Sequence, residues 1–221
     1  KWYGGLHRKI LSFVSHFFVQ DENSKELLQS LSITRATLSG DTRFDRVWAN
    51  AQRPKAIPAI KEFSAGHKVF IAGSTWPSDE ELIAKLVIQY PGWKFILAPH
   101  EIDEDKIEKL IALLPPDAAT MYSDIANATD ISYVKSQISC LIIDNIGMLS
   151  SLYQYGDIAY IGGGFGAGIH NTLEAAAFGL PVIFGPEYSK FKEAKDLISL
   201  QAGFSVSNQA ELQNVTNNLV N

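Results

Sequence analysis

The strongest constraint on the fold is an alternation of short apolar runs with segments of helical periodicity from residue 68 onward. Strands are expected at Lys68–Ala72, Lys94–Ala98, Ala119–Tyr122, Leu141–Asp144, Asp157–Ile161 and Pro181–Phe184. Helices are expected at Ser78–Gln89, Asp103–Leu114, Met148–Tyr155, Asn171–Phe178, Glu193–Leu200 and Gln209–Leu219. Short apolar strands that alternate with helices of this length are typical of α/β proteins. The pattern therefore predicts a doubly wound parallel sheet.

The beginning of the chain is less regular. Short strands are expected at Phe13–Val19 and Ala36–Ser39, with a helical segment between them. Glycine and proline interrupt the pattern between about Gly40 and Pro58, which marks a candidate domain boundary. We therefore expect two segments, residues 1–45 and residues 46–221.

Composition and charge exclude some functions. The 221 residues are 46% hydrophobic, which suits a soluble globular protein. The net charge is −5 and no cluster of lysine or arginine stands out, so a nucleic-acid-binding surface is not expected. The single cysteine, Cys140, lies in an apolar run and is expected to be a buried thiol.

The chain shows no apolar stretch near the roughly 20 residues needed to span a bilayer. It starts at Lys1 without an initiator methionine or a signal-peptide pattern. We therefore expect a soluble piece of a longer protein, in which any membrane anchor lies in the missing portion.

A glycine-rich segment follows the strand expected at Asp157–Ile161. It holds five glycines in the seven residues 162–168, among them Gly163 and Gly164. Glycine allows positive φ and lets a ligand approach the backbone, and a helix start next to such a loop favours an anion. The segment predicts a phosphate site, with His170 and Asn171 at the helix start as further donors. The alternative is a turn that only permits tight strand–helix packing.

The same segment matches a dinucleotide-binding fingerprint at Gly162, Gly164 and Ala167. That fingerprint belongs to the first strand–helix unit and needs an acidic residue at the end of the next strand. Here the glycines come late, and the next strand runs into Gly185 and Pro186. A nicotinamide-dependent oxidoreductase is therefore disfavoured, and no cofactor is expected.

Glu174 lies in the first turn of the helix that follows the glycines. Its carboxylate is expected to accept hydrogen bonds from the two ribose hydroxyls of a nucleotide. The alternative is a favourable interaction with the helix dipole, and Asn171 has a similar alternative as a helix cap.

Further candidates follow other strands, because ligands of such sheets bind outside the carboxyl ends of the strands. Gly73 and Ser74 form a small turn that offers a second oxyanion contact, and His100 follows the next strand. Gly147 ends the loop that begins at Asp144, and Lys190 precedes a closing helix. For each of them an ordinary structural role is the alternative. No spacing typical of a metal site or of a nucleophilic triad is present.

Five segments in this order give the chain a family resemblance. They are Gly40–Val47 (GDTRFDRV), Ala72–Thr75 (AGST), Ile142–Gly147 (IIDNIG), Gly162–Gly166 (GGGFG) and His170–Pro186 (HNTLEAAAFGLPVIFGP). Together they resemble the 3-deoxy-D-manno-octulosonic acid (Kdo) transferases of Gram-negative lipopolysaccharide synthesis. The resemblance covers nearly the whole chain, and the last segment is the most specific.

The resemblance implies an inverting, metal-independent GT-B glycosyltransferase of two Rossmann-like domains. Its donor is CMP-Kdo, its acceptor is a lipid A precursor, and it acts at the cytoplasmic face of the inner membrane. The chain looks like the carboxyl-terminal, donor-binding domain (46–221) preceded by the tail of the amino-terminal domain and a linker (1–45). In this family the general base is a glutamate of the amino-terminal domain. We therefore expect no catalytic residue in this chain, no activity of the fragment alone, and membrane contact only through the missing portion.

The chain departs from the family pattern at some positions. Many members show Pro-Arg-His-Pro-Glu where this chain has Ala98–Ile102 (APHEI), so the arginine is absent. Two other functions stay open. One is a GT-B transferase or epimerase that uses a UDP-sugar, and the other is a nucleotide-binding module without transfer activity.

Overall fold

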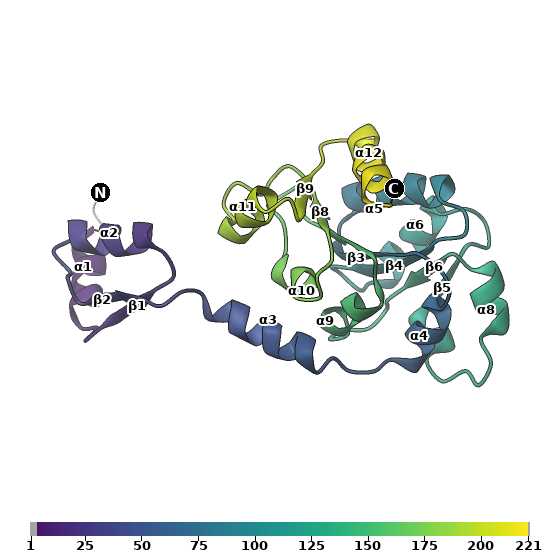
Figure 1. The fold of residues 1–221 in the computed structure, drawn as a ribbon, viewed down its shortest axis with the longest axis horizontal. Coiled ribbons are helices and arrows are strands. Elements are labelled where there is room, and N and C mark those ends of the chain that lie inside the picture. Colours follow the sequence, from purple (N-terminus) through teal and green to yellow (C-terminus); the bar gives the residue numbers. More distant parts are fainter. Residues whose placement is uncertain (1–3, 221) are drawn as a thin grey trace. The chain divides into compact units, whose positions relative to one another are not determined.

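The computed structural model describes residues 4–220 (Figure 1). The chain divides into two compact units, with the division between Arg46 and Val47. The first three residues of the expected segment 1–45 and the last residue of the expected segment 46–221 lie outside the described residues. The assignment of these segments to two domains of a longer enzyme stays a prediction.

The first unit holds two helices and two short strands. They are α1 (Gly4–Ser12), β1 (Phe17–Val19), α2 (Glu22–Ser30) and β2 (Ala36–Leu38). The strands pair in parallel. Asp21 begins α2, because its side chain accepts a hydrogen bond from the amide of Ser24 at 2.7 Å. Helix α1 was not predicted, and the strand expected from Phe13 begins only at Phe17.

Helix α3 (Thr42–Gln52) crosses the division, and the second unit contains the larger sheet. Its strands are β3 (Val69–Thr75), β4 (Lys94–Pro99), β5 (Ala119–Met121), β6 (Cys140–Ile142), β7 (Ile158–Ile161), β8 (Val182–Phe184) and β9 (Gly203–Ser205). Its helices are α4 (Pro58–Ser64), α5 (Pro77–Gln89), α6 (Glu104–Leu113), α7 (Tyr122–Ile125), α8 (Ser132–Gln137), α9 (Leu149–Leu152), α10 (Leu173–Ala176), α11 (Lys192–Ser199) and α12 (Gln209–Val220).

The seven strands of the second unit form one sheet in the order β5-β6-β4-β3-β7-β8-β9. Every pairing between them is parallel. After β3 the chain adds β4 beside it, forms the edge with β5, and inserts β6 between β4 and β5. It then returns to the other side of β3 with β7, β8 and β9. The predicted doubly wound parallel α/β sheet is therefore confirmed. Its direction of winding reverses between β3 and β7.

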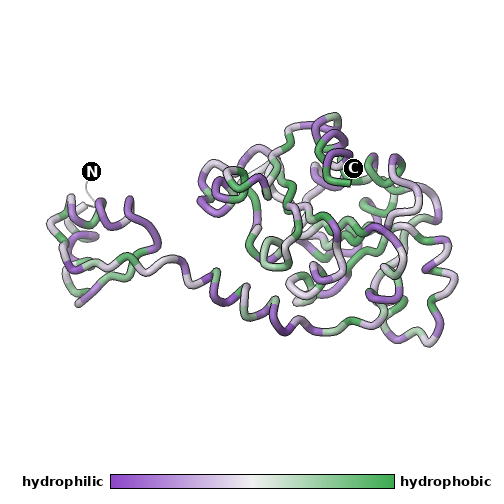
Figure 2. Tube along the Cα trace, viewed as in Figure 1, coloured by the Kyte–Doolittle hydropathy of each residue, from purple (hydrophilic) through white to green (hydrophobic). Residues whose placement is uncertain are grey.

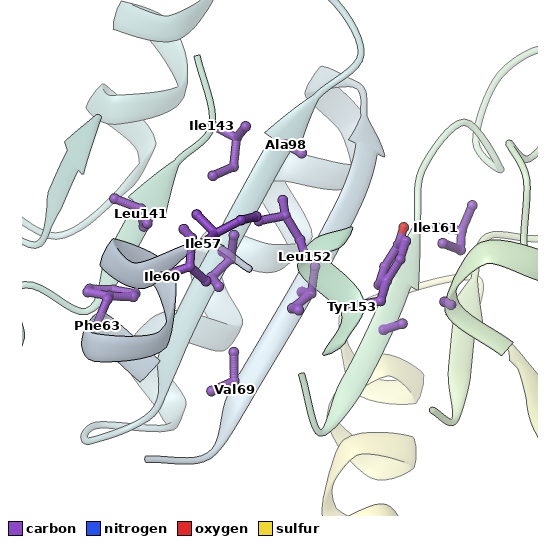
Figure 3. Packing of buried hydrophobic residues seen from close by; sticks show 14 of the residues in the cluster. Ile57, Ile60, Phe63, Val69, Ala98, Leu141, Ile143, Leu152, Tyr153 and Ile161 are labelled. Atoms are coloured by element: carbon purple, nitrogen blue, oxygen red, sulfur yellow. The ribbon is translucent and has the colours of Figure 1, made fainter. Parts of the chain in front are cut away.

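Both faces of the sheet are covered, which explains why the strands are apolar throughout. Val69 and Ile71 of β3 belong to one buried cluster, and Phe70 and Ala72 belong to the other, because successive side chains of a strand point to opposite faces. The first cluster includes residues of α4, α9, α10 and α11, and Figure 3 shows some of its members. The second includes residues of α5, α6 and α12. The central strands stand out as hydrophobic in Figure 2.

The buried thiol expected at Cys140 is confirmed, since its side chain is fully buried in the second cluster. Burial raises the pKa of this thiol to about 12, and the nearby Ser139 hydroxyl and Lys94 oppose the rise. The thiol is therefore neutral near pH 7. None of the helices within residues 4–220 has the length and apolar character needed to cross a membrane.

Several elements differ from the predictions. Strand β9 and the short helices α4, α7 and α8 were not predicted. The helix expected at Met148–Tyr155 is one α-helical turn, α9, followed by a 3-10 turn at Tyr153–Tyr155. The helix expected at Asn171–Phe178 is a single turn, α10. These elements are too short for periodicity to identify, and packing against the sheet determines their extent.

Candidate functional site

The loops that follow β3, β4, β7 and β8 emerge at the carboxyl edge of four neighbouring strands. The reversal between β3 and β7 places the turn after β3 beside the glycine-rich loop 162–172. A crevice at such a reversal is the usual ligand site of an open α/β sheet. The loops that follow β3 and β7, at the centre of the sheet, are therefore the candidate ligand site.

The glycine loop is held against the end of β3. The amide of Gly162 donates a hydrogen bond to the carbonyl of Gly73 at 2.9 Å. A Cβ atom on Gly162 would collide with the carbonyl oxygen of Ser74 and lie 2.7 Å from Cα of Thr75. Only glycine permits this approach of two backbones. Ser74 itself has a φ of 54°, where β3 is irregular.

The loop is equally close to the segment after β8. A Cβ atom on Gly164 would lie 2.6 Å from the backbone of Gly185, and the Gly164 carbonyl accepts a hydrogen bond from the amide of Glu187 at 2.9 Å. A Cβ atom on Gly168 would lie 2.8 Å from the ring of Phe191. The glycines thus permit the close packing of three loops, which differs from the strand–helix packing expected as the structural alternative.

The backbone donors of the loop are partly used within the protein. The amides of Gly166 and Gly168 donate to the carbonyl of Gly163, and the amide of His170 donates to that of Gly162. Within residues 4–220 no acceptor is recorded for the amides of Phe165 and Ala167. The expected contribution of a helix start is reduced, because α10 begins at Leu173 and has only four residues.

A buried carboxylate that the sequence did not single out anchors the loop. Asp79, in the first turn of α5, is 1% exposed. It accepts hydrogen bonds from the amide of Gly163 at 2.9 Å, the amide of Trp76 at 2.9 Å and the hydroxyl of Tyr160 at 2.7 Å. Asp79 therefore connects α5, β7 and the glycine loop. In the sequence, Asp79 has a position typical of an acidic residue that caps a helix. Its partner on β7, Tyr160, is distant in the chain and could not be predicted from the sequence.

Asn171 and Glu174 form a second connected group. The Asn171 side-chain oxygen accepts from the amide of Leu173 at 3.1 Å, and its nitrogen donates to Oε1 of Glu174 at 3.0 Å. Thr172, not Asn171, is the N-cap residue of α10, and Asn171 closes a turn just before the helix. Its side-chain nitrogen supports the half-buried Glu174 carboxylate.

Glu174 also lies close to the turn after β3, through Tyr153. Burial raises the pKa of Tyr153, and the charge of Glu174 raises it further. A Cβ atom on Gly73 would collide with the Tyr153 hydroxyl and lie 2.8 Å from Cδ1 of Leu149. Gly73 therefore makes room for Tyr153, and Glu174 interacts electrostatically with that same tyrosine.

Three aromatic rings gather at the same edge of the sheet. The rings of His100 and His170 are stacked with centroids 4.3 Å apart, and that of Trp76 stacks on His100 at 4.7 Å. The indole Nε1 of Trp76 donates to Nε2 of His170 at 3.0 Å. The two predicted histidines, His100 and His170, are therefore in contact. Trp76 was missed, although its place directly after β3 was a usable signal.

Two pockets lie beside Trp76. One, of about 430 Å³, is lined by the start of α5, the glycine loop and His170. The other, of about 450 Å³, lies between α5 and α6 and includes Glu80. Burial raises the pKa of the Glu80 carboxyl, although a hydrogen bond from Thr75 opposes the rise. Of the predicted site residues, Gly163 and His170 line the first pocket.

Two predicted residues lie apart from these contacts. Gly147, with a φ of 92°, follows β6, which β4 separates from β3. Lys190 is exposed in the loop between β8 and α11. The contacts recorded for residues 4–220 join neither of them to the other predicted residues. In the same range of the chain, no three His, Cys, Asp or Glu side chains gather into a group that could hold a metal ion.

The chain is similar to Kdo transferases over nearly its whole length. It is 28% identical to the 3-deoxy-D-manno-octulosonic acid transferase of Rickettsia bellii over 221 residues, which cover 96% of this chain and 50% of that protein. It is 29% identical to a bifunctional glycosyltransferase/methyltransferase of Fusobacterium nucleatum over 213 residues, which cover 93% of this chain and 32% of that protein. The chain thus spans half or less of each of these relatives. No protein-family profile matches it.

Among solved structures, the chain is similar to the C-terminal CMP-Kdo binding domain of WaaA from Acinetobacter baumannii. The TM-score is 0.61 at 16% identity, and the match covers 81% of this chain and 90% of that one. The two proteins therefore share a fold, in agreement with the parallel α/β sheet described above.

Proposed function

We propose that this chain is the donor-binding portion of a glycosyltransferase that transfers Kdo from CMP-Kdo to a lipid A precursor. The observation that carries the proposal is the similarity to Kdo transferases over 96% of the chain. It is supported by the position of the predicted residues other than Gly147 and Lys190 near the reversal of the sheet, where such folds bind ligands.

In the proposed complex, Glu174 accepts hydrogen bonds from the ribose hydroxyls of the cytidine nucleotide. A carboxylate is suited to this task because it accepts without donating, while the two hydroxyls donate. The bond from Asn171 holds it in place.

The single phosphate of CMP-Kdo lies against the glycine loop in this proposal. The amides of Phe165 and Ala167 have no recorded acceptor in the described chain, and Ser74 and His170 supply further donors. Donors aimed at the departing phosphate stabilise the charge that develops as the glycosidic bond breaks, an effect worth about 3–4 kcal/mol for one donor in a well-studied site.

The general base belongs to another portion of the enzyme in this proposal, as does the acceptor site. The transfer is inverting and needs no metal, and the whole enzyme works at the cytoplasmic face of the inner membrane. The chain by itself binds the donor without turnover. A transfer assay with a lipid acceptor, with and without the rest of the protein, tests these statements.

Calorimetry with CMP, UMP and UDP tests the choice of nucleotide. We expect CMP to bind more tightly than UMP or UDP. A preference for UDP favours a UDP-sugar enzyme instead, and the absence of binding by all three contradicts a donor-binding role.

The role of Glu174 is tested by Glu174→Ala with Glu108→Ala as control, since Glu108 is exposed on α6. Loss of a charge-assisted hydrogen bond, worth about 1.5–3 kcal/mol, weakens CMP binding by roughly 10- to 150-fold. Unchanged CMP affinity in Glu174→Ala shows that the ribose assignment is wrong.

A further inference from the structure

The ring nitrogens of His170 are not equivalent in this structure. Nε2 accepts the hydrogen bond from the Trp76 indole at 3.0 Å. An indole N–H only donates, so Nε2 must be without a proton when this bond forms. The neutral His170 ring therefore carries its proton on Nδ1.

The two ring nitrogens of His170 lie on opposite edges of the ring. A Cβ atom on Gly163 would lie 3.1 Å from Cδ2 and 3.3 Å from Nε2 of His170, so this edge is packed against the glycine loop. Nδ1 lies on the other edge of the ring. His170 also lines the pocket of about 430 Å³ together with Trp76 and Gly163.

The surroundings of His170 favour its neutral form. Burial lowers its pKa, the stacked His100 lowers it further, and only Asp79 on α5 acts in the opposite direction. Protonation of His170 would also break its bond to Trp76, because both partners would then be donors.

We propose that Trp76 is a positioning residue that holds His170 as the Nδ1–H tautomer, so that Nδ1 donates to a phosphate oxygen of the nucleotide in this pocket. The inference rests on the proposed function and adds a residue and a protonation state to it. The bound anion then meets an oriented neutral donor, and its affinity does not depend on a positive charge at His170.

The test is Trp76→Phe, which keeps a ring to stack on His100 and removes the indole N–H. Trp93→Phe is the matched control, because Trp93 lies just before β4, at the amino-terminal ends of the strands, whereas Trp76 follows the carboxyl end of β3. Nitrogen chemical shifts of the His170 ring, assigned with His170→Gln, report the tautomer and the pKa without any ligand. Thermal unfolding of each variant establishes that it is folded.

We expect the Nδ1–H tautomer in the unmodified chain and in Trp93→Phe. In Trp76→Phe we expect a mixture of tautomers and a higher pKa of His170. CMP affinity of Trp76→Phe falls roughly two- to tenfold at pH 8, as for the loss of one oriented hydrogen bond. The loss of CMP affinity in Trp76→Phe becomes smaller toward pH 6, because His170 of this variant, with its higher pKa, is then protonated and attracts the phosphate. The ratio to the unmodified chain is the quantity to compare, since the CMP phosphate also titrates with a second pKa of about 6.

An Nε2–H tautomer in the unmodified chain overturns the inference. So does a Trp76→Phe variant whose tautomer and CMP affinity match those of the unmodified chain at both pH values. If the unmodified chain does not bind CMP, the proposed function fails, and the ligand-free tautomer then decides whether Trp76 positions His170.

Discussion

Asp79 offers the sharpest test of how the candidate site is held together. Its carboxylate is 1% exposed and accepts from two backbone amides and the Tyr160 hydroxyl. Asp79→Ala removes the acceptor of all three hydrogen bonds at once. The amide of Gly163 and the hydroxyl of Tyr160 are themselves buried, so they would be left without partners. The amide of Trp76 can find water, because this residue is 37% exposed.

The expected loss of stability follows from the two buried donors that would have no acceptor. Each buried group left unsatisfied costs about 1–3 kcal/mol, so Asp79→Ala should lower the free energy of unfolding by about 2–6 kcal/mol. Asp79→Asn should cost only about 1–2 kcal/mol. Its oxygen can still accept from both amides, and its nitrogen can donate to the Tyr160 oxygen.

Urea unfolding followed by circular dichroism measures both variants. Glu108→Ala serves as the control, for which a change within about 0.5 kcal/mol is expected of an exposed position. A cost below about 1 kcal/mol for Asp79→Ala would refute the reasoning, because it would mean that the two buried donors find other partners.

Two further predictions concern the same region. Gly164→Ala should lower the free energy of unfolding by about 1–3 kcal/mol, because its Cβ would press on the Gly185 backbone. Gly5→Ala in α1 is the control and should stabilise slightly, since nothing lies within 4 Å of a Cβ there. Thermal unfolding compares the two variants, and equal melting temperatures would contradict the prediction. Burial lowers the pKa of His170 in the folded chain. As the pH falls, the unfolded chain therefore binds a proton at His170 before the folded chain does. The contribution of His170 to stability is present above pH 6.5 and is lost as the pH falls through its folded pKa. Urea unfolding between pH 8 and pH 5 should therefore show a fall in stability that is smaller in His170→Gln, and an identical fall in both would contradict the assignment.

The main sheet was largely predictable because its strands are buried on both faces and read as apolar runs. This holds for β3, β4, β6, β7 and β8. Strand β9, Gly203–Ser205, was missed because a three-residue edge strand with a serine has no such signal. Helix α10 was predicted too long, because its alanine-rich sequence favours a helix while the loop before it ends only at Thr172.

The candidate site was predictable where a residue type signals its own chemistry. The five glycines, Asn171 and Glu174 belong to this kind, and the structure brings Asn171 and Glu174 into contact. The contribution of Asp79 and Trp76 was not visible, because it depends on partners more than 80 residues away in the chain. Whether the predicted residues bind a nucleotide stays a prediction.

The fold class and the position of the glycine loop could be predicted from the amino-acid sequence, because both depend on local periodicity and on the intrinsic backbone freedom of glycine. The contacts of the loop became known only from the folded arrangement of the strands. The reversal of the sheet between β3 and β7 places Asp79 under Gly163 and Trp76 against His170. These contacts arise from the order of the strands, and buried donors and acceptors find their partners only once that order is set.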